Sequence, residues 1–242
     1  MRKTLLLFSV LISFASYSQA AKVDSVAVLI LDRMSDVIGG LNSCSFKLNV
    51  SQDVTGDIGL EKKFSDDEVM FKGPDKMLVQ LKGDDNHKGF WYNGRHLVYY
   101  SYTENNYSVL EVPSTIIETI DAVHDEYGVD FPASDFFYPT FADDILADFT
   151  SVTFLGRKTV DGEDCYHILA DSKNQSVQLW ISDDAMNLPL RFLVIYKDKP
   201  NSPQYMGVFS DWKINPDLPD ALFDFNEPPL ATEIVMLKKS NQ

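Results

Sequence analysis

Residues 88–102, KGFWYNGRHLVYYSY, carry the strongest local structure signal in the chain. Asn93-Gly94 lies between two segments, and both residues tolerate the positive φ that a type I′ hairpin turn requires. The flanking segments are rich in aromatic and β-branched residues, which favour strands. The stretch therefore predicts two antiparallel strands joined by a tight turn.

A two-residue period extends from this hairpin over residues 43–112. Phe46, Leu48 and Val50 alternate with polar residues, so one face of that strand is expected to be buried and the other wet. Asp161-Gly162 predicts a second hairpin turn further along the chain. The remaining strands are expected at 68–72, 76–82, 88–92, 95–102, 106–112, 152–159, 165–170, 176–182, 189–197 and 205–212.

Helical signals flank and interrupt these strands. Asp24 is a good N-cap for a first helix that Gly39-Gly40 would end. Thr115 and Glu118 form a capping box for a second helix, which ends at Gly128. A third, shorter helix is expected over 141–149, and a helical turn near 218–222. About eleven strands around an inserted helical pair predict an α+β fold with a large antiparallel sheet.

The first twenty residues have the layout of a secretory signal. Two basic residues precede the apolar run Leu5–Ala15, and Ser18-Gln19-Ala20 offers small residues to the signal peptidase. The apolar run has about half the roughly 20 residues that a membrane-spanning helix needs. We predict cleavage after Ala20, export to the periplasm, and a mature chain that forms one domain over 21–242.

The net charge and the cysteines limit the partners and the covalent chemistry. Residues 21–242 contain 19 Lys and Arg against 36 Asp and Glu, a net charge of −17. Nucleic acids and anionic membrane surfaces are therefore not expected as partners, because both require a basic surface. Without a cysteine at the cleavage point, no lipid anchor is predicted. Cys44 and Cys165 are a candidate disulfide, because the periplasm is oxidising, or two buried thiols.

Several segments, in order along most of the mature chain, resemble a family of predicted periplasmic proteins of unknown function. They include residues 90–97, 104–107, 120–122, 127–132, 160–167, 179–181, 188–191, 223–225 and 228–229. That family is similar in fold to the lipoprotein-carrier superfamily. The resemblance implies a strongly curved, unclosed antiparallel β-barrel with a helical lid, a periplasmic location, and an apolar cavity for an acyl chain or similar ligand. It implies no catalytic residues.

The sequence contains no recognisable catalytic or metal-binding motif. His87, His96, His124 and His167 lack the close spacing of a zinc site. The paired carboxylates at 66–68, 143–144 and 183–184 are expected in solvated turns and helix starts. We therefore predict no catalytic residues, no metal and no cofactor.

The 27 Phe and Tyr residues suggest a use beyond an ordinary core. In an unclosed barrel they could line a cavity for an apolar guest, or they could fill the core and form cross-strand pairs. The cavity candidates are residues on the face of each strand that is expected to point inward, and on the apolar face of the second helix. These are Leu97, Tyr99, Ile116, Ile120, Val123, Val177, Leu179, Ile181, Phe192, Val194 and Tyr196.

Three functional hypotheses remain at this point. The leading one is a non-catalytic periplasmic carrier for a lipid, a lipoprotein acyl chain or another apolar ligand. The second is a protein-interaction or envelope-sensing module with a filled core, and the third, weaker one is an enzyme that uses carboxylates. A large apolar void would favour the carrier, a filled core the interaction module, and convergent buried carboxylates the enzyme.

Overall fold

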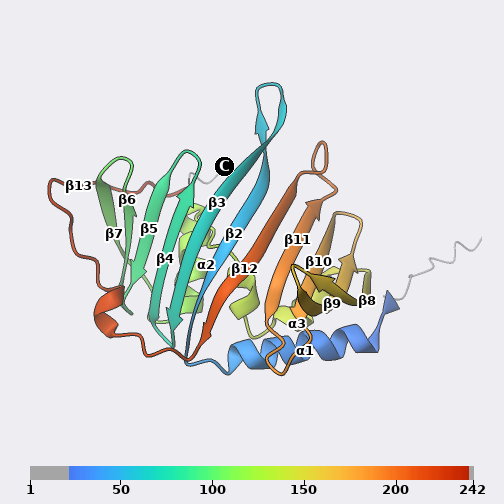
Figure 1. Ribbon diagram of the computed structural model, residues 1–242. Coiled ribbons are helices and arrows are strands. Elements are labelled where there is room, and N and C mark those ends of the chain that lie inside the picture. The colour runs from blue at the N-terminus through green and yellow to red at the C-terminus, as the bar shows by residue number, and fades with distance from the viewer. Residues whose placement is uncertain (1–21, 240–242) are drawn as a thin grey trace, which may run out of the picture.

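One curved, unclosed sheet organises residues 22–239, the part of the chain that the computed structural model describes. Figure 1 shows its strands side by side, with helices on one face. The order across the sheet is β1-β8-β9-β10-β11-β12-β2-β3-β4-β5-β6-β7-β13. Neighbours are antiparallel except at the two edges, where the short strands β1 and β13 pair in parallel with β8 and β7. The predicted signal sequence and its predicted cleavage site lie outside the described residues.

The eleven predicted strands are all present, but the strand predicted at 68–72 begins nine residues earlier, at Gly59. The eleven expected strands are β2 (Ser43–Gly56), β3 (Gly59–Lys72), β4 (Lys76–Gly83), β5 (His87–Tyr92), β6 (His96–Ser101), β7 (Asn106–Glu111), β8 (Ser151–Val160), β9 (Glu163–Asp171), β10 (Gln175–Ser182), β11 (Pro189–Tyr196) and β12 (Gln204–Ile214). The two additional strands are β1 (Lys22–Val23) and β13 (Thr232–Glu233). Two-residue strands show no periodicity, so the sequence pattern could not reveal them.

The helices begin at the predicted caps. α1 (Ser25–Gly39) has Asp24 as its N-cap, and α2 (Ile116–Tyr127) begins after Thr115, whose side chain accepts the Glu118 N–H. α2 ends at Gly128, which has the left-handed conformation that glycine favours. A 3₁₀ turn, η1 (Ser134–Phe137), and the helix α3 (Phe141–Asp148) follow, and a second 3₁₀ turn, η2 (Asp220–Phe223), comes after β12. The predicted helical pair is confirmed.

The two hairpin turns differ from each other. Asp161 and Gly162 both have positive φ and join β8 directly to β9, as a type I′ turn does. At the other turn only Gly94 has positive φ, and four residues separate the paired residues Tyr92 and Leu97. The predicted hairpin at 93–94 is confirmed, but the prediction that its turn is of type I′ is wrong. The Asn93 side chain accepts the N–H groups of Arg95 and His96, which supports the wider loop.

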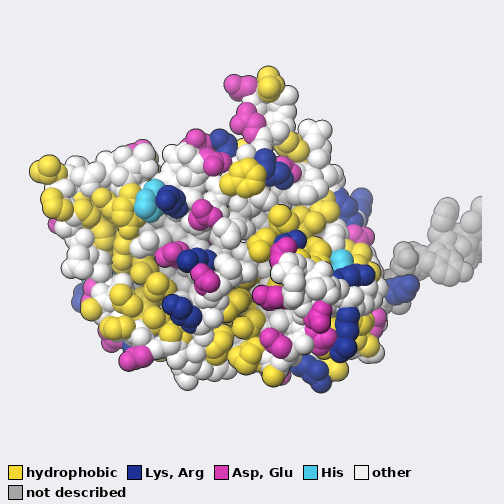
Figure 2. All heavy atoms as spheres, in the orientation of Figure 1, with side chains coloured by type: hydrophobic (Ala, Val, Ile, Leu, Met, Phe, Trp, Pro, Cys, Tyr) yellow, Lys and Arg dark blue, Asp and Glu magenta, His cyan; other side chains and the backbone are white. Residues whose placement is uncertain are grey.

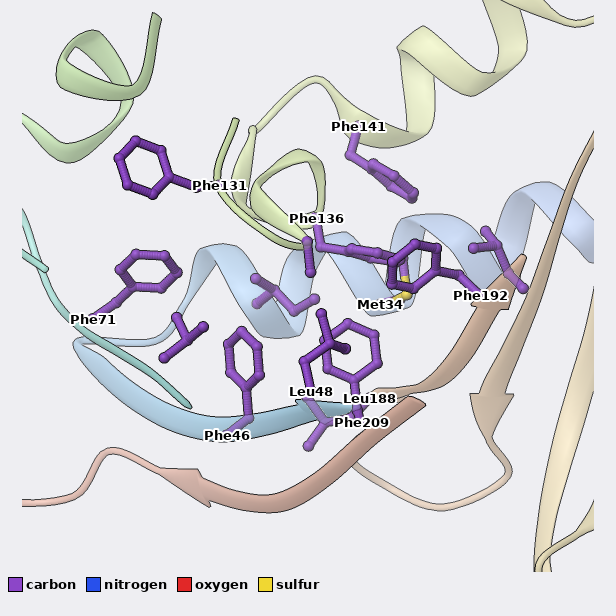
Figure 3. Close-up of a cluster of buried hydrophobic side chains, with 14 of the residues drawn as sticks. Met34, Phe46, Leu48, Phe71, Phe131, Phe136, Phe141, Leu188, Phe192 and Phe209 are labelled. Atoms are coloured by element: carbon purple, nitrogen blue, oxygen red, sulfur yellow. The ribbon is translucent and has the colours of Figure 1, made fainter. Parts of the chain in front are cut away.

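The main hydrophobic core lies between the sheet and the helices, on the side that we call the inner face. α1 packs against α3, η1 and β8. Figure 3 shows phenylalanine rings from both layers in contact, including Phe46 and Phe209 from the sheet and Phe136 from η1. The alternation in β2 is confirmed, because Phe46, Leu48 and Val50 are buried and Lys47 and Asn49 are exposed. The core therefore holds the helical insert, the segment between β7 and β8 that contains α2, η1 and α3, at a fixed place on the sheet.

Other aromatic residues lie on the opposite, outer face of the sheet. Figure 2 shows hydrophobic side chains gathered at the left, over β5–β7. The segment after β12 crosses this region, and Phe225 packs against Trp91, Tyr100 and Tyr107 at ring-centroid distances of 5.2–5.6 Å. Nearby, Phe223 is 1% exposed. Part of the aromatic content therefore anchors the C-terminal segment and does not line a cavity.

Cys44 and Cys165 are both buried and unbridged, so the candidate disulfide is not formed. Cys44 is in β2 and Cys165 is in β9, and β10, β11 and β12 lie between these strands. Four inter-strand steps of about 4.8 Å separate the two strands by roughly 19 Å along the sheet. A disulfide requires Cα atoms about 4.4–6.8 Å apart. Burial raises the pKa of the Cys44 thiol to about 12, which keeps it protonated.

Gly207 in β12 provides a first testable prediction. An added Cβ would lie 2.3 Å from Cε1 of Phe192, whose ring already packs against Phe136, Tyr205 and Phe209. We therefore expect Gly207→Ala to lower the free energy of unfolding by about 1–3 kcal/mol, measured by urea denaturation.

Gly39→Ala in α1 is the matched control. A Cβ there meets nothing within 4 Å, and alanine favours a helix over glycine. This variant should gain up to about 1 kcal/mol of stability. A stabilising or neutral Gly207→Ala would contradict the packing described for Phe192.

Candidate functional site

A cavity of about 990 Å³ opens on the inner face of the sheet. Its walls come from β2–β5 on one side and β10–β12 on the other. Residues 130–149, which contain η1 and α3, form the third side. Because these elements are far apart in the sequence, the cavity depends on the curvature of the sheet and on the position of the helical insert.

The wall formed by β10 and β11 is apolar. The strand register places Val177 opposite Val194 and Leu179 opposite Phe192, so these four side chains form one continuous surface. Phe131, Phe136 and Ile145 contribute from the helical insert. A surface of this composition fits a hydrocarbon chain, because it offers dispersion contacts and few hydrogen-bonding groups.

The mouth of the cavity is acidic. Seven aspartates line the cavity as a whole, against two lysines, Lys63 and Lys88. Lys63 forms an ion pair with Asp85 at 2.6 Å, so its charge is already balanced. Asp130 contacts His124 at 2.6 Å, and Asp84 accepts the Phe64 N–H. The negative potential of this rim favours neutral or cationic ligands.

Asp67 lies inside the cavity wall and is 3% exposed. In β3 it pairs with Leu48 of β2 and Leu81 of β4, so its carboxyl group lies in a row of apolar side chains. Oδ1 of Asp67 has no hydrogen-bond partner among the described residues. Burial raises the pKa of this carboxyl group to about 7, opposed by hydrogen bonding from Ser65 and the charge of Lys88.

The burial of Asp67 corrects the expectation that residues 66–68 are solvated. Asp66 and Glu68 do point outward and are exposed, but Asp67 shares the inner face with Val69 and Phe71. The sequence carried a signal for this placement. Because the side chains of a strand alternate between its two faces, Asp67, two residues before Val69, points to the same face as Val69 and Phe71.

Other polar groups in the cavity also have altered acidity. Asp135 lines the cavity, and desolvation, with the charges of Asp130 and Asp144, raises its pKa. Burial also raises the pKa values of Tyr196 and Tyr205. Both phenols therefore stay protonated at neutral pH and can donate hydrogen bonds.

Five of the eleven predicted cavity residues line this cavity: Val177, Leu179, Phe192, Val194 and Tyr196. The structure places the other six elsewhere. Ile116 lines a second, smaller cavity of about 300 Å³, Tyr99 packs at the edge of the core, and the rest lie in the core. Those core residues are Leu97, Ile120, Val123 and Ile181.

Three of the four remaining paired carboxylates have structural partners. Asp183 forms an ion pair with Arg157 at 2.8 Å, and Asp184 accepts the Ser182 hydroxyl and two backbone N–H groups. Asp144 accepts the Thr140 hydroxyl at the start of α3. Among the described residues, Asp67 is the one charged side chain classed as buried. The convergent buried carboxylates that would favour an enzyme are therefore not found in this part of the chain.

Two further features concern metals and membranes. No cluster of three His, Cys, Asp or Glu side chains within residues 22–239 is arranged to hold a metal ion. His167 stacks on Trp180 and hydrogen-bonds to Gln178, and burial lowers its pKa. No helix in the same range has the length and apolar character needed to cross a membrane.

The curved, unclosed sheet, its helical insert and its cavity define an α+β open-barrel protein. The sequence also matches one known protein family. The chain belongs to the family described as predicted periplasmic protein (DUF2092), whose model matches residues 27–237. No curated protein matches the sequence.

Several solved structures are similar to this chain at low sequence identity and with TM-scores below 0.5. An uncharacterised conserved protein from Thermus thermophilus has 13% identity and a TM-score of 0.45, with 86% of this chain and 98% of that chain covered. The lipoprotein LppX from Mycobacterium tuberculosis has 12% identity and a TM-score of 0.44, with coverages of 81% and 98%. A LolA superfamily protein from Nitrosomonas europaea has 14% identity and a TM-score of 0.39, with coverages of 82% and 97%.

Proposed function

We propose that the chain is a non-catalytic periplasmic carrier that binds the hydrocarbon part of a lipid or a lipoprotein acyl chain in this cavity. In this proposal the signal sequence is cleaved after Ala20, and residues 21–242 are released without a lipid anchor as one carrier-like domain. The observation that supports it most strongly is the cavity of about 990 Å³ with an apolar wall. Ligand cavities in proteins commonly measure about 300–1,000 Å³.

The same cavity favours a carrier over the two alternatives. An interaction module with a filled core would not need an open space bounded by three groups of elements. An enzyme would need reacting groups within hydrogen-bond reach of one another. Asp67 instead lies between Leu48 and Leu81. Such a site can bind a ligand without a chemical reaction.

The proposal can be tested on the mature chain purified from the periplasm. Native mass spectrometry should detect a co-purifying amphiphile, and the uncharged dye Nile red should fluoresce more strongly when added to delipidated protein. A protein that carries no amphiphile and does not bind Nile red would overturn the proposed function.

A cavity-filling variant gives a sharper prediction. Val194→Trp introduces an indole opposite Val177 and should weaken Nile red binding by about tenfold or more, because it occupies the space along the apolar wall. Leu193→Trp is the matched control, since Leu193 points to the other face of the same strand. Equal binding by the two variants would show that the dye does not occupy the cavity.

A further inference from the structure

The buried carboxyl group of Asp67 indicates which head group the cavity accepts. The residue is only 3% exposed, Oδ1 has no hydrogen-bond partner among the described residues, and Asp67 lines the cavity. A buried acceptor without a partner is costly for a protein. A ligand that donates a hydrogen bond to this oxygen would remove that cost.

The charge around the cavity restricts the donor further. The seven aspartates and two lysines of the lining give a formal charge of −5 when all are ionised. Among the lining residues, Lys88 is the one cation that forms no ion pair with another described residue. Lys88 of β5 pairs with Leu81 of β4, and Leu81 pairs in turn with Asp67 of β3. An anionic head group would meet repulsion at the rim and at Asp67, whereas a cationic one would be attracted to both.

The position of Asp67 also fits an amphiphile whose head enters the cavity. Asp67 is on β3, and the apolar wall of Val177, Leu179, Phe192 and Val194 is on β10 and β11, on the other side of the same cavity. A ligand can therefore place its polar head at Asp67 and extend its hydrocarbon chain along that wall.

We propose that the ligand is a long-chain amphiphile with a cationic, hydrogen-bond-donating head group, such as an amine, that pairs with Asp67. This inference rests on the proposed carrier function and specifies its ligand class. Amphiphiles with a carboxylate or phosphate head group are selected against.

The test compares three probes with the same twelve-carbon alkyl chain: dodecylamine, dodecanol and tridecanoate. Each is titrated, below its micelle concentration and at slightly alkaline pH, against the protein with Nile red bound. We expect dodecylamine to displace the dye at a concentration about tenfold lower than tridecanoate does, with dodecanol between them. This order reports the head group alone, because the chains are identical.

The variants Asp67→Asn and Asp66→Asn remove the same charge from adjacent residues. Asp67 faces the cavity, whereas Asp66 faces outward and is bound to Asn49. We expect Asp67→Asn to weaken dodecylamine binding by about tenfold and to change dodecanol binding little, and Asp66→Asn to leave both close to the unmodified protein.

The outcomes separate this inference from the function on which it rests. Displacement of Nile red by all three probes at similar concentrations, or most readily by tridecanoate, would overturn the proposal of a cationic head group and leave the carrier function standing. Absence of Nile red binding would overturn both. If Asp67→Asn does not fold, the order of the three probes on the unmodified protein still decides the question.

Discussion

Replacing Phe46 with alanine is expected to lower the free energy of unfolding by about 3–5 kcal/mol. The Phe46 side chain is 2% exposed, and its ring lies 4.5 Å from that of Trp212 and 5.3 Å from that of Phe209. It also stacks on Phe137 of η1 at 5.9 Å. The alanine variant would leave a void at the place where β2, β12 and the helical insert meet.

Urea denaturation followed by circular dichroism measures this effect on a chain of residues 21–242. Phe64→Ala is the matched control, because Phe64 on the neighbouring strand β3 is 56% exposed. Its loss should cost less than about 1 kcal/mol. Similar losses for the two variants would contradict the central packing role of Phe46. Since η1 borders the cavity, Phe46→Ala should also weaken Nile red binding.

The second large effect is a dependence of stability on pH that originates at Asp67. Burial raises the pKa of its carboxyl group from 3.8 to about 7 in the folded protein. The folded state therefore holds the proton more tightly than the unfolded state does. The stabilising contribution of the protonated group is fully present below pH 3.8 and is lost as the pH rises through about 7.

The size of the effect follows from the rise in the pKa of Asp67 from 3.8 to about 7, which corresponds to at most about 4 kcal/mol. We expect Asp67→Asn to be more stable than the unmodified protein at alkaline pH and to lose this advantage towards acidic pH. The groups that act on Asp67 are Ser65, Asp66 and Lys88, with Tyr205 also nearby.

The measurement is the difference in unfolding free energy between Asp67→Asn and the unmodified protein at several pH values from about 4 to about 8. Taking this difference cancels the titration of groups that both proteins share. The exposed Asp66→Asn should show a nearly constant difference over the same range. A constant difference for Asp67→Asn as well would mean that its carboxyl group ionises normally in the folded state.

The sequence was sufficient where the signal is local. Asp24 and Thr115 fix the helix starts because a cap acts on N–H groups two or three residues away. Asp161-Gly162 fixes a turn because both residues tolerate positive φ. The alternation in β2 identifies its buried face because side chains of a strand point alternately to the two faces. These interactions span few residues, so the sequence by itself determined the longer elements, their order and the α+β class, but not the two-residue edge strands β1 and β13.

The tertiary structure decided what depends on distant residues. Ile120 and Val177 both carry the pattern of a buried face, but Ile120 contributes to the core and Val177 lines the cavity. Asp67 lies in an acidic run that resembles a solvated turn, and it is buried because β2 and β4 pair on either side of it. Cys44 and Cys165 are kept apart by three intervening strands. Hydrophobic burial is not directional, so the pattern shows which side chains leave water, and only the packing of remote elements determines whether they meet a core or a cavity.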